Sequence, residues 1–104
     1  MNIINIAELY TKTPGARHKV DGPFSGEDFR EKYLEKYFNN LGDDSIITIV
    51  LDGTAGYGTS FLEEAFGGLA RKYGKDKCLK RLDFISNEDK LLLEEIKGYI
   101  ENAT

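Results

Sequence analysis

The segment Ser45–Leu51, which reads SIITIVL, constrains the fold more than any other part of the chain. It is short, rich in β-branched residues and apolar at both odd and even positions, which is typical of a strand covered on both faces. Such a strand belongs at the centre of a sheet with helices packed against it. We therefore expect an α/β fold around this strand. The residues expected in its core are Ile47, Ile49, Leu51, Phe66 and Leu69.

Local patterns place further strands on both sides of this segment. Residues 3–10 open with three isoleucines and are predicted to form a short strand. Arg17–Val20 is interpreted as the return strand of a hairpin, after a turn at Pro14 and Gly15. Lys77–Ile85 alternates loosely between polar and apolar residues, which also favours a strand.

Three helices are predicted, each starting at a serine with an acidic residue three positions later, which is the pattern of a capping box. The expected starts are Ser25 with Asp28, Ser60 with Glu63, and Ser86 with Asp89, and the first two helices are expected to end at Gly42 and Gly74. The order β(β)αβαβα predicts a small mixed sheet of about four strands with about three helices. The chain of 104 residues is expected to form a single domain, residues 1–104.

Composition excludes several classes of function. The chain has 14 basic and 18 acidic residues, and this net charge of −4 disfavours nucleic acid and anionic membranes as partners. Its apolar runs are far shorter than the roughly 18 residues of a membrane span. Cys78 and His18 are single, so they cannot form a disulfide or a zinc site of soft ligands, and we expect no metal and no cofactor. We expect Cys78 to be buried or half-buried and His18 to be solvated.

The N-terminus carries no basic residues ahead of its apolar ones and has no small-residue cleavage site. These features predict that there is no signal peptide. We therefore expect a cytoplasmic protein.

The most informative loop is Asp52–Thr59, which joins the predicted central strand to a helix start. Its glycines are Gly53, Gly56 and Gly58. Glycines let the backbone approach a ligand or a partner closely, and a helix N-terminus favours anions. Asp52 is expected either to hold the backbone amides of the loop or to line a ligand site. The spacing from Gly53 to Ser60 nearly matches a phosphate-binding loop, but Thr59 replaces the essential lysine, so an ATPase is not predicted.

Three interpretations of Thr59 and Ser60 are open. In the first, Ser60 caps the helix and the glycines only form a tight turn. In the second, the loop is a pocket for a small anion or a nucleotide. In the third, the two hydroxyls are displayed for phosphorylation or for contact with a protein partner. If Ser60 caps the helix, Thr59 is the more exposed hydroxyl.

Two blocks of sequence, GPFSGEDFR (Gly22–Arg30) and GYGTSFLEEAFGGL (Gly56–Leu69), resemble the bacterial STAS-like domain family of unknown function. The resemblance covers roughly residues 14–74 and implies a small α/β fold like that of anti-sigma-factor antagonists. Those antagonists are bound and phosphorylated by a serine kinase of the histidine-kinase-like ATPase class. Their acceptor lies in a turn at a helix N-terminus, which matches Gly58-Thr59-Ser60 here. Gly58 replaces the aspartate that precedes the acceptor, and Phe61 replaces the glycine that follows it.

Charged residues supply further hypotheses. One stretch of an acidic chain is rich in cations, which either end a helix on a solvated surface or form a docking patch for an acidic partner. These cations are Arg71, Lys72, Lys75, Lys77, Lys80 and Arg81. Glu63 and Glu64 point about 100° apart on a helix, so they are interpreted as capping and dipole partners and not as an acid/base pair. Arg17 and Arg30 flank the segment 22–26 at the start of the first helix, and one of them is a candidate to approach the glycine-rich loop.

The resulting prediction is a non-catalytic regulatory domain that acts through a protein partner. The expected partner is a histidine-kinase-like ATPase, and the expected contact or modified site is Gly58-Thr59-Ser60. The alternative is a small anion- or nucleotide-binding module that uses the same loop. An enzyme is not predicted, because one histidine, one cysteine and no metal cluster leave few catalytic groups.

Overall fold

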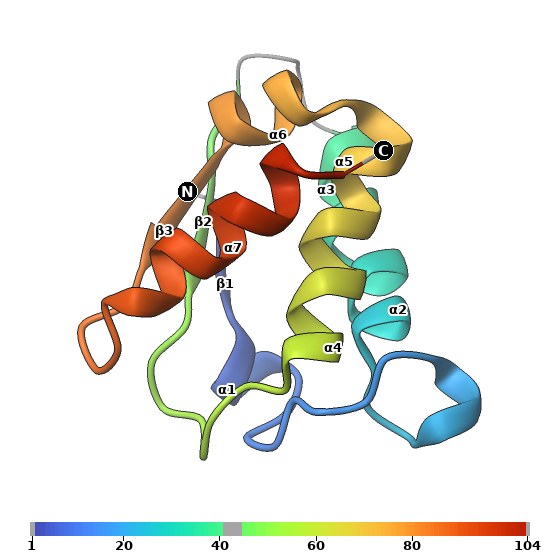
Figure 1. Ribbon diagram of the computed structural model, residues 1–104, viewed down its shortest axis with the longest axis vertical. Coiled ribbons are helices and arrows are strands. Elements are labelled where there is room, and N and C mark those ends of the chain that lie inside the picture. Colours follow the sequence, from blue (N-terminus) through green and yellow to red (C-terminus); the bar gives the residue numbers. More distant parts are fainter. Residues whose placement is uncertain (1, 41–44, 104) are drawn as a thin grey trace.

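The sheet of the protein is built from parallel strands. The computed structural model describes residues 2–40 and 45–103. Its strands are β1 (Ile3–Asn5), β2 (Ile47–Val50) and β3 (Leu82–Ile85), arranged in this order (Figure 1). The prediction of a central strand at β2 is therefore confirmed. Ile4, Ile49 and Phe84 lie side by side across the sheet.

Two long helices follow the first two strands, and each becomes π-helical for one turn in its middle. The first consists of α2 (Gly26–Phe29), η2 (Arg30–Leu34) and α3 (Glu35–Asn40), and the second of α4 (Thr59–Leu62), η3 (Glu63–Gly67) and α5 (Gly68–Tyr73). The remaining helical elements are α1 (Ile6–Leu9), the 3-10 turn η1 (Lys19–Asp21), α6 (Lys75–Arg81) and α7 (Leu91–Glu101). The α/β class is confirmed, but within residues 2–40 and 45–103 the sheet is parallel and not mixed as predicted, because helical segments connect its strands. The strands there are also fewer than predicted and the helices more numerous. The predicted helix end at Gly42 lies outside the described residues.

The strand order determines where the helices lie. Parallel strands placed in sequence order and joined by right-handed crossovers put every connecting helix on the same face of the sheet. Figure 1 shows the two long helices and α7 on one side of the strands. Along β2, Ile47 and Ile49 are buried, whereas Thr48 and Val50 are half-buried. The prediction that this strand is covered on both faces is therefore wrong.

The core lies between the sheet and this single layer of helices. The five residues predicted to be in the core are all buried: Ile47, Ile49, Leu51, Phe66 and Leu69. Where the long helices cross, the ring centroid of Phe29 lies 5.8 Å from that of Phe61 and 6.5 Å from that of Phe66. A Cβ at Gly26 would clash with the carbonyl of Phe61, so glycine allows the two helices to approach closely.

The predicted return strand at Arg17–Val20 does not form. The segment leads into η1, and its neighbourhood contributes only an isolated bridge between Ala16 and Ser25. Val20, the one apolar residue of the segment, is 91% exposed. A segment that buries no apolar side chain gains little from pairing as a strand.

The predicted strand Lys77–Ile85 divides into the end of α6 and the strand β3. Cys78, Arg81 and Leu82 are all buried. Their spacing of three and four residues from Cys78 is the period of a helix and not of a strand. The prediction is therefore correct only for the last four residues.

The predicted cap of the first helix forms with one change. The Asp28 N–H donates to the Ser25 hydroxyl at 3.0 Å, as expected. The carboxylate of Asp28, however, accepts from the hydroxyl of Tyr10 at 2.7 Å, and the same hydroxyl accepts the Ser25 N–H at 3.0 Å. Tyr10 thus completes the capping box across a distance of 15 residues in the sequence.

The other two predicted caps are wrong. Helix α4 begins at Thr59 with Gly58 at the N-cap, so Ser60 lies inside the first turn. Helix α7 begins at Leu91, and the hydroxyl of Ser86 donates to the carbonyl of Asp89 without capping the helix. The acidic residues that suggested these caps have other partners. Glu63 pairs with Arg17 and Arg71, and the carboxylate of Asp89 accepts the N–H of Leu91.

Replacing Phe66 with alanine is expected to lower the free energy of unfolding by about 3–5 kcal/mol, because the ring is fully buried between sheet and helices. Urea denaturation followed by circular dichroism measures this change. Phe24→Ala is the matched control, since Phe24 is 43% exposed and its loss should cost clearly less. Equal losses for the two variants would contradict the assignment of the core.

Candidate functional site

The glycine-rich loop follows β2 and leads into α4. Gly53 and Gly56 have φ angles of 94° and 131°, in the region that residues with a Cβ rarely adopt. Gly58 has an ordinary φ of −70°, but a Cβ there would lie only 2.7 Å from the carbonyl oxygen of Gly15. Backbone conformation therefore requires the first two glycines, and a close backbone contact requires the third.

The backbone amides of this loop are bound by other parts of the chain. Three N–H groups donate at 2.8 Å: Gly53 to the Glu88 carboxylate, Ala55 to the Lys12 carbonyl and Gly58 to the Pro14 carbonyl. An anion cradle needs such amides to point at the ligand. These three amides are occupied, so the loop is a braced turn.

Asp52 holds backbone amides, as one interpretation predicted, but they belong to the next loop. Its carboxylate accepts the N–H of Asn87 and the N–H of Glu88, each at 2.9 Å. These backbone hydrogen bonds lower the pKa of Asp52. Because Glu88 in turn accepts the Gly53 N–H, the loops after β2 and β3 are tied together in both directions.

A cavity of about 260 Å³ lies between these two loops and α7. Thr59 lines it, together with four carboxyl side chains, those of Asp52, Glu88, Asp89 and Glu95. Among the described residues, no lysine or arginine lines the cavity. This acidic lining disfavours a phosphate or a nucleotide, which carries charge of the same sign.

Thr59 and Ser60 are the first two residues of α4. Thr59 is exposed, and Ser60 is half-buried. Thr59 is therefore the more accessible hydroxyl, as predicted. The predicted reason is wrong, because Gly58 and not Ser60 occupies the N-cap.

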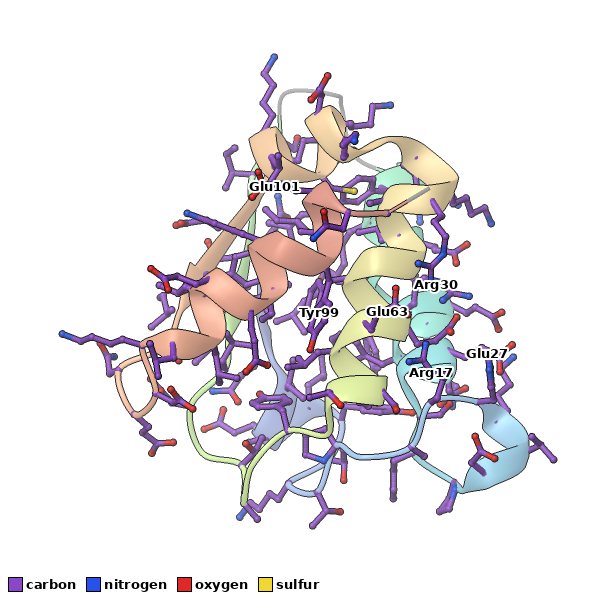
Figure 2. The ribbon with its side chains drawn as sticks, viewed as in Figure 1. Arg17, Glu27, Arg30, Glu63, Tyr99 and Glu101 are labelled. Carbon is purple, nitrogen blue, oxygen red and sulfur yellow. The ribbon has the colours of Figure 1, made fainter. Side chains whose placement is uncertain are left out.

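A second group of charged residues lies where the two long helices meet (Figure 2). We call it the ion-pair network. Its pairs are Arg71–Glu63 at 2.6 Å, Arg17–Glu63 at 2.6 Å, Arg17–Glu64 at 3.4 Å, Arg30–Glu64 at 2.6 Å, Arg30–Glu35 at 2.9 Å and Lys72–Glu35 at 2.5 Å. Figure 2 shows Arg17 approaching from the loop before α2 and Glu63 from η3. The interpretation of Glu63 and Glu64 as capping acids is therefore wrong, and both Arg17 and Arg30 reach the helix that follows the glycine-rich loop.

The π-turns and a pair of glycines make this network possible. Arg30 and Glu35 are five residues apart, a spacing that matches the i to i+5 pattern of a π-turn. A Cβ at Gly67 would lie 2.6 Å from Oε2 of Glu63, and one at Gly68 would clash with the guanidinium of Arg30. The Gly-Gly pair therefore gives the charged side chains room to lie against the helix.

The network keeps its carboxyl groups ionised. The hydrogen bond from Arg71 lowers the pKa of Glu63. Burial raises the pKa values of Glu35 and Glu64, but hydrogen bonds from their basic partners outweigh it and both values are lowered. A carboxyl group with a lowered pKa is a poor proton donor near neutral pH, and the ion pairs of these residues join separate segments of the chain.

Arg81 does not belong to an exposed docking patch. It is 1% exposed, and its guanidinium lies 4.3 Å from the ring centroid of Phe38. Its Nε donates to the carbonyl of Ser45 at 3.1 Å. The prediction of a surface role is wrong for this residue, because the helical spacing of α6 turns it into the core.

The other cations of the stretch also have partners within the chain. Arg71 and Lys72 belong to the ion-pair network, and Nζ of Lys75 donates to the carbonyl of Glu101 at 3.1 Å. Lys77 and Lys80 interact with other groups as well. The first explanation, helix-end cations, therefore accounts for most of the stretch, and a docking patch stays a prediction.

Tyr10 and Glu88 also bind to the segments around the site, and neither residue was predicted to do so. Burial raises the pKa of Tyr10, whose hydroxyl joins Ser25 and Asp28. Glu88 is bonded to Gly53, 35 residues away. No local pattern marks either residue, because their partners are distant in the sequence.

Cys78 and His18 are placed as expected. Cys78 is buried, and burial raises the pKa of its thiol to about 12. His18 is exposed. Within the described part of the chain, no three histidine, cysteine or acidic side chains are grouped to hold a metal ion.

The family model of STAS-like domains of unknown function (DUF4325) matches residues 25–91, more than half of the chain. The chain belongs to this family. The matched range includes both long helices, the glycine-rich loop and most of the cavity lining. Comparisons with curated proteins and with solved structures found no match. None of the helices in the described ranges of this STAS-like domain has the length and apolar character that a membrane span requires.

Replacing Arg30 with methionine in the STAS-like domain is expected to lower the free energy of unfolding by about 3 kcal/mol near neutral pH. This is the low end for breaking a buried ion pair, because Glu35 and Glu64 each keep a second cation. Urea denaturation measures the change. Lys19→Met is the control, because it breaks an exposed pair with Glu31 and should cost clearly less than Arg30→Met.

The difference in the free energy of unfolding between the wild type and Arg30→Met should depend on pH. A carboxyl group whose pKa is lowered in the folded state adds stability that is present above the unfolded value of about 4.3 and is lost as the pH falls through the folded value. The wild type should therefore lose stability on acidification below about pH 5 more steeply than Arg30→Met. Parallel curves for the two proteins would contradict a stabilising role of the network.

Cys78 is expected to react slowly with iodoacetamide at neutral pH, because the buried thiol with its raised pKa forms little thiolate. Mass spectrometry of the labelled protein measures the rate. The unfolded protein in urea is the control and should label at the rate of a free cysteine. Equally fast labelling of the folded protein would contradict the burial of Cys78.

Proposed function

We infer that this STAS-like domain is a non-catalytic regulatory module that binds a protein partner through Gly58, Thr59 and Ser60, here called the Thr59 turn. The observation that carries the inference is the exposed residue Thr59 at the start of a long helix, next to a loop whose amides are bound within the chain. A turn braced in this way presents one fixed shape, which suits recognition by another protein.

The expected partner is a serine kinase of the histidine-kinase-like ATPase class, as the family resemblance implies. In that reaction Oγ1 of Thr59 bonds to the γ-phosphorus of ATP held by the partner. The bond to the β-phosphate bridging oxygen breaks, ADP leaves, and the hydroxyl proton passes to a base of the partner. Thr59 is the better candidate of the two hydroxyls because it is exposed and Ser60 is half-buried.

A phosphate on Thr59 would change the surface sharply. It would add up to two negative charges at a helix N-terminus, where the dipole favours them. The same charges would lie beside the four carboxyl groups that line the cavity, which repel them. The helix dipole would therefore favour the phosphate, whereas the carboxyl groups would disfavour it. This balance suits a reversible switch of partner binding.

The alternative function, an anion- or nucleotide-binding module, has less support. The amides of Gly53, Ala55 and Gly58 already have acceptors, and the adjacent cavity is lined by carboxyl groups. Both features work against a negatively charged ligand.

The proposal predicts that Thr59→Glu weakens binding to a kinase of this class from the same genome at least tenfold, because a larger charged side chain enters the contact. Isothermal titration calorimetry measures the affinity, and phosphopeptide mapping after incubation with ATP should place the phosphate on Thr59. Lys36→Glu is the matched control, since Lys36 is exposed on α3 and should leave binding unchanged.

Circular dichroism should show that the Thr59→Glu fold is intact. Thr59→Ala should abolish the phosphate, and Ser60→Ala should retain it. Binding that is unaffected by both Thr59→Glu and Ser60→Glu would place the contact elsewhere.

A further inference from the structure

Strand β3 ends the sheet formed by the described strands and pairs with β2 on one side. The carbonyl of Ile85 accepts the Leu51 N–H, so Ile85 and Asp83 direct their backbone groups toward β2. Leu82 and Phe84 alternate with them and direct theirs to the outer edge. The Leu82 N–H is used at the end of α6. The carbonyl of Leu82 and both backbone groups of Phe84 therefore face a position where another strand fits.

A partly apolar hollow of about 300 Å³ lies beside this edge. The residues that line it come from α6, β3 and α7: Leu79, Leu82, Asp83, Phe84, Leu93 and Lys97. Leu79 is 39% exposed despite its apolar side chain. The edge thus offers apolar surface as well as backbone hydrogen-bonding groups, the combination used when sheets extend from one chain to another.

Helix α7 carries a stripe of alternating charge. Lys90, Glu94, Lys97 and Glu101 are all exposed. They are spaced by four, three and four residues, so they lie along one face of the helix. The order of charge along the stripe is positive, negative, positive, negative.

This stripe lies on the flank of α7 next to β3. Leu93 and Lys97 line the hollow at the strand edge, whereas Leu92 and Glu95 line the acidic cavity on the other flank. Figure 1 shows α7 close to β3, the strand at this edge of the sheet. The strand edge and the charged stripe therefore form one surface, here called the β3 surface.

We propose that the β3 surface binds a second copy of this chain in a two-fold dimer. The two β3 strands pair antiparallel and join the two sheets into one of six strands. The two α7 helices lie antiparallel beside each other above the junction. The proposal does not depend on the proposed function, because the Thr59 turn lies at the other flank of α7 and stays accessible in such a dimer.

The order of charge selects a second copy as the partner. An antiparallel copy places Lys90 opposite Glu101 and Glu94 opposite Lys97, and a single axis between residues 95 and 96 relates all of these pairs. A two-fold interface must be complementary to itself, and this stripe is complementary to its own reverse. The stripe thus has the self-complementary charge that a symmetric dimer requires.

The pairing of the two β3 strands is compatible with the same two-fold axis. With Phe84 opposite Phe84 of the second copy, each N–H donates to the other carbonyl, which is the hydrogen-bonded pair of an antiparallel ladder. Phe84 and Lys97 line the same hollow, so the centre of the strand pair lies near the centre of the charged stripe, as one shared axis requires. On the outer face Asp83 then lies opposite Ile85, so the strands place no like charges against each other.

The test is a charge exchange on α7. Lys97→Glu places like charges opposite each other twice in the dimer, and it should raise the dimer dissociation constant about tenfold. Glu94→Lys should do the same. The double variant Glu94→Lys, Lys97→Glu restores complementarity and should regain the wild-type constant. Sedimentation velocity at protein concentrations up to about 1 mM measures all of these constants.

Two further measurements separate this dimer from other contacts. The two single variants should form a heterodimer on mixing, because each then presents the charges that the other needs. Lys36→Glu changes the net charge by the same amount on α3 and should leave the dissociation constant unchanged. Hydrogen exchange should show the Phe84 amide becoming protected as the wild-type concentration rises.

A wild type that stays monomeric up to about 1 mM would overturn the proposal. A dimer that Lys97→Glu and Lys36→Glu affect equally would overturn it as well. The charged positions are exposed, so these substitutions should leave the fold intact, and circular dichroism checks this.

Discussion

The order of the three parallel strands is the constraint on which the rest of the structure depends. Because each crossover has the same hand and the order never reverses, all connecting helices share one face. The opposite face keeps half-buried side chains such as Thr48 and Val50. The same order brings the loops that follow β2 and β3 together at one end of the sheet, where Asp52 and Glu88 tie them to each other. The candidate site is thus a product of the strand order.

Charged groups hold the two long helices to each other in addition to their apolar packing. The ion-pair network does this by joining both long helices and the loop that carries Arg17. Its geometry depends on irregular features: one π-turn in each helix and the Gly67-Gly68 pair that leaves room for the side chains. The acidic pair Glu63 and Glu64 therefore stabilises tertiary structure, at positions where a local rule suggests a helix cap.

Sequence patterns predicted the features that depend on nearest neighbours. The central strand, its buried residues and the Ser25 cap follow from local periodicity and side-chain chemistry. The patterns failed where a distant partner decides the outcome. Arg81 looked like a surface cation because its burial depends on the direction of α6 and on the ring of Phe38. Ser60 looked like a cap because no local pattern shows that the backbone contact of Gly58 with Gly15 starts the helix earlier.

Helix α7 lies between the two surfaces for which functions are proposed. One flank, with Leu92 and Glu95, closes the acidic cavity beside Thr59, and the other flank, with Leu93 and Lys97, borders the edge of β3. Ile96 and Ile100 are fully buried between these two flanks and fix the helix in the core. A phosphate on Thr59 would repel Glu95 on the first flank, whereas the β3 edge lies against the second flank, so the same helix borders both proposed surfaces.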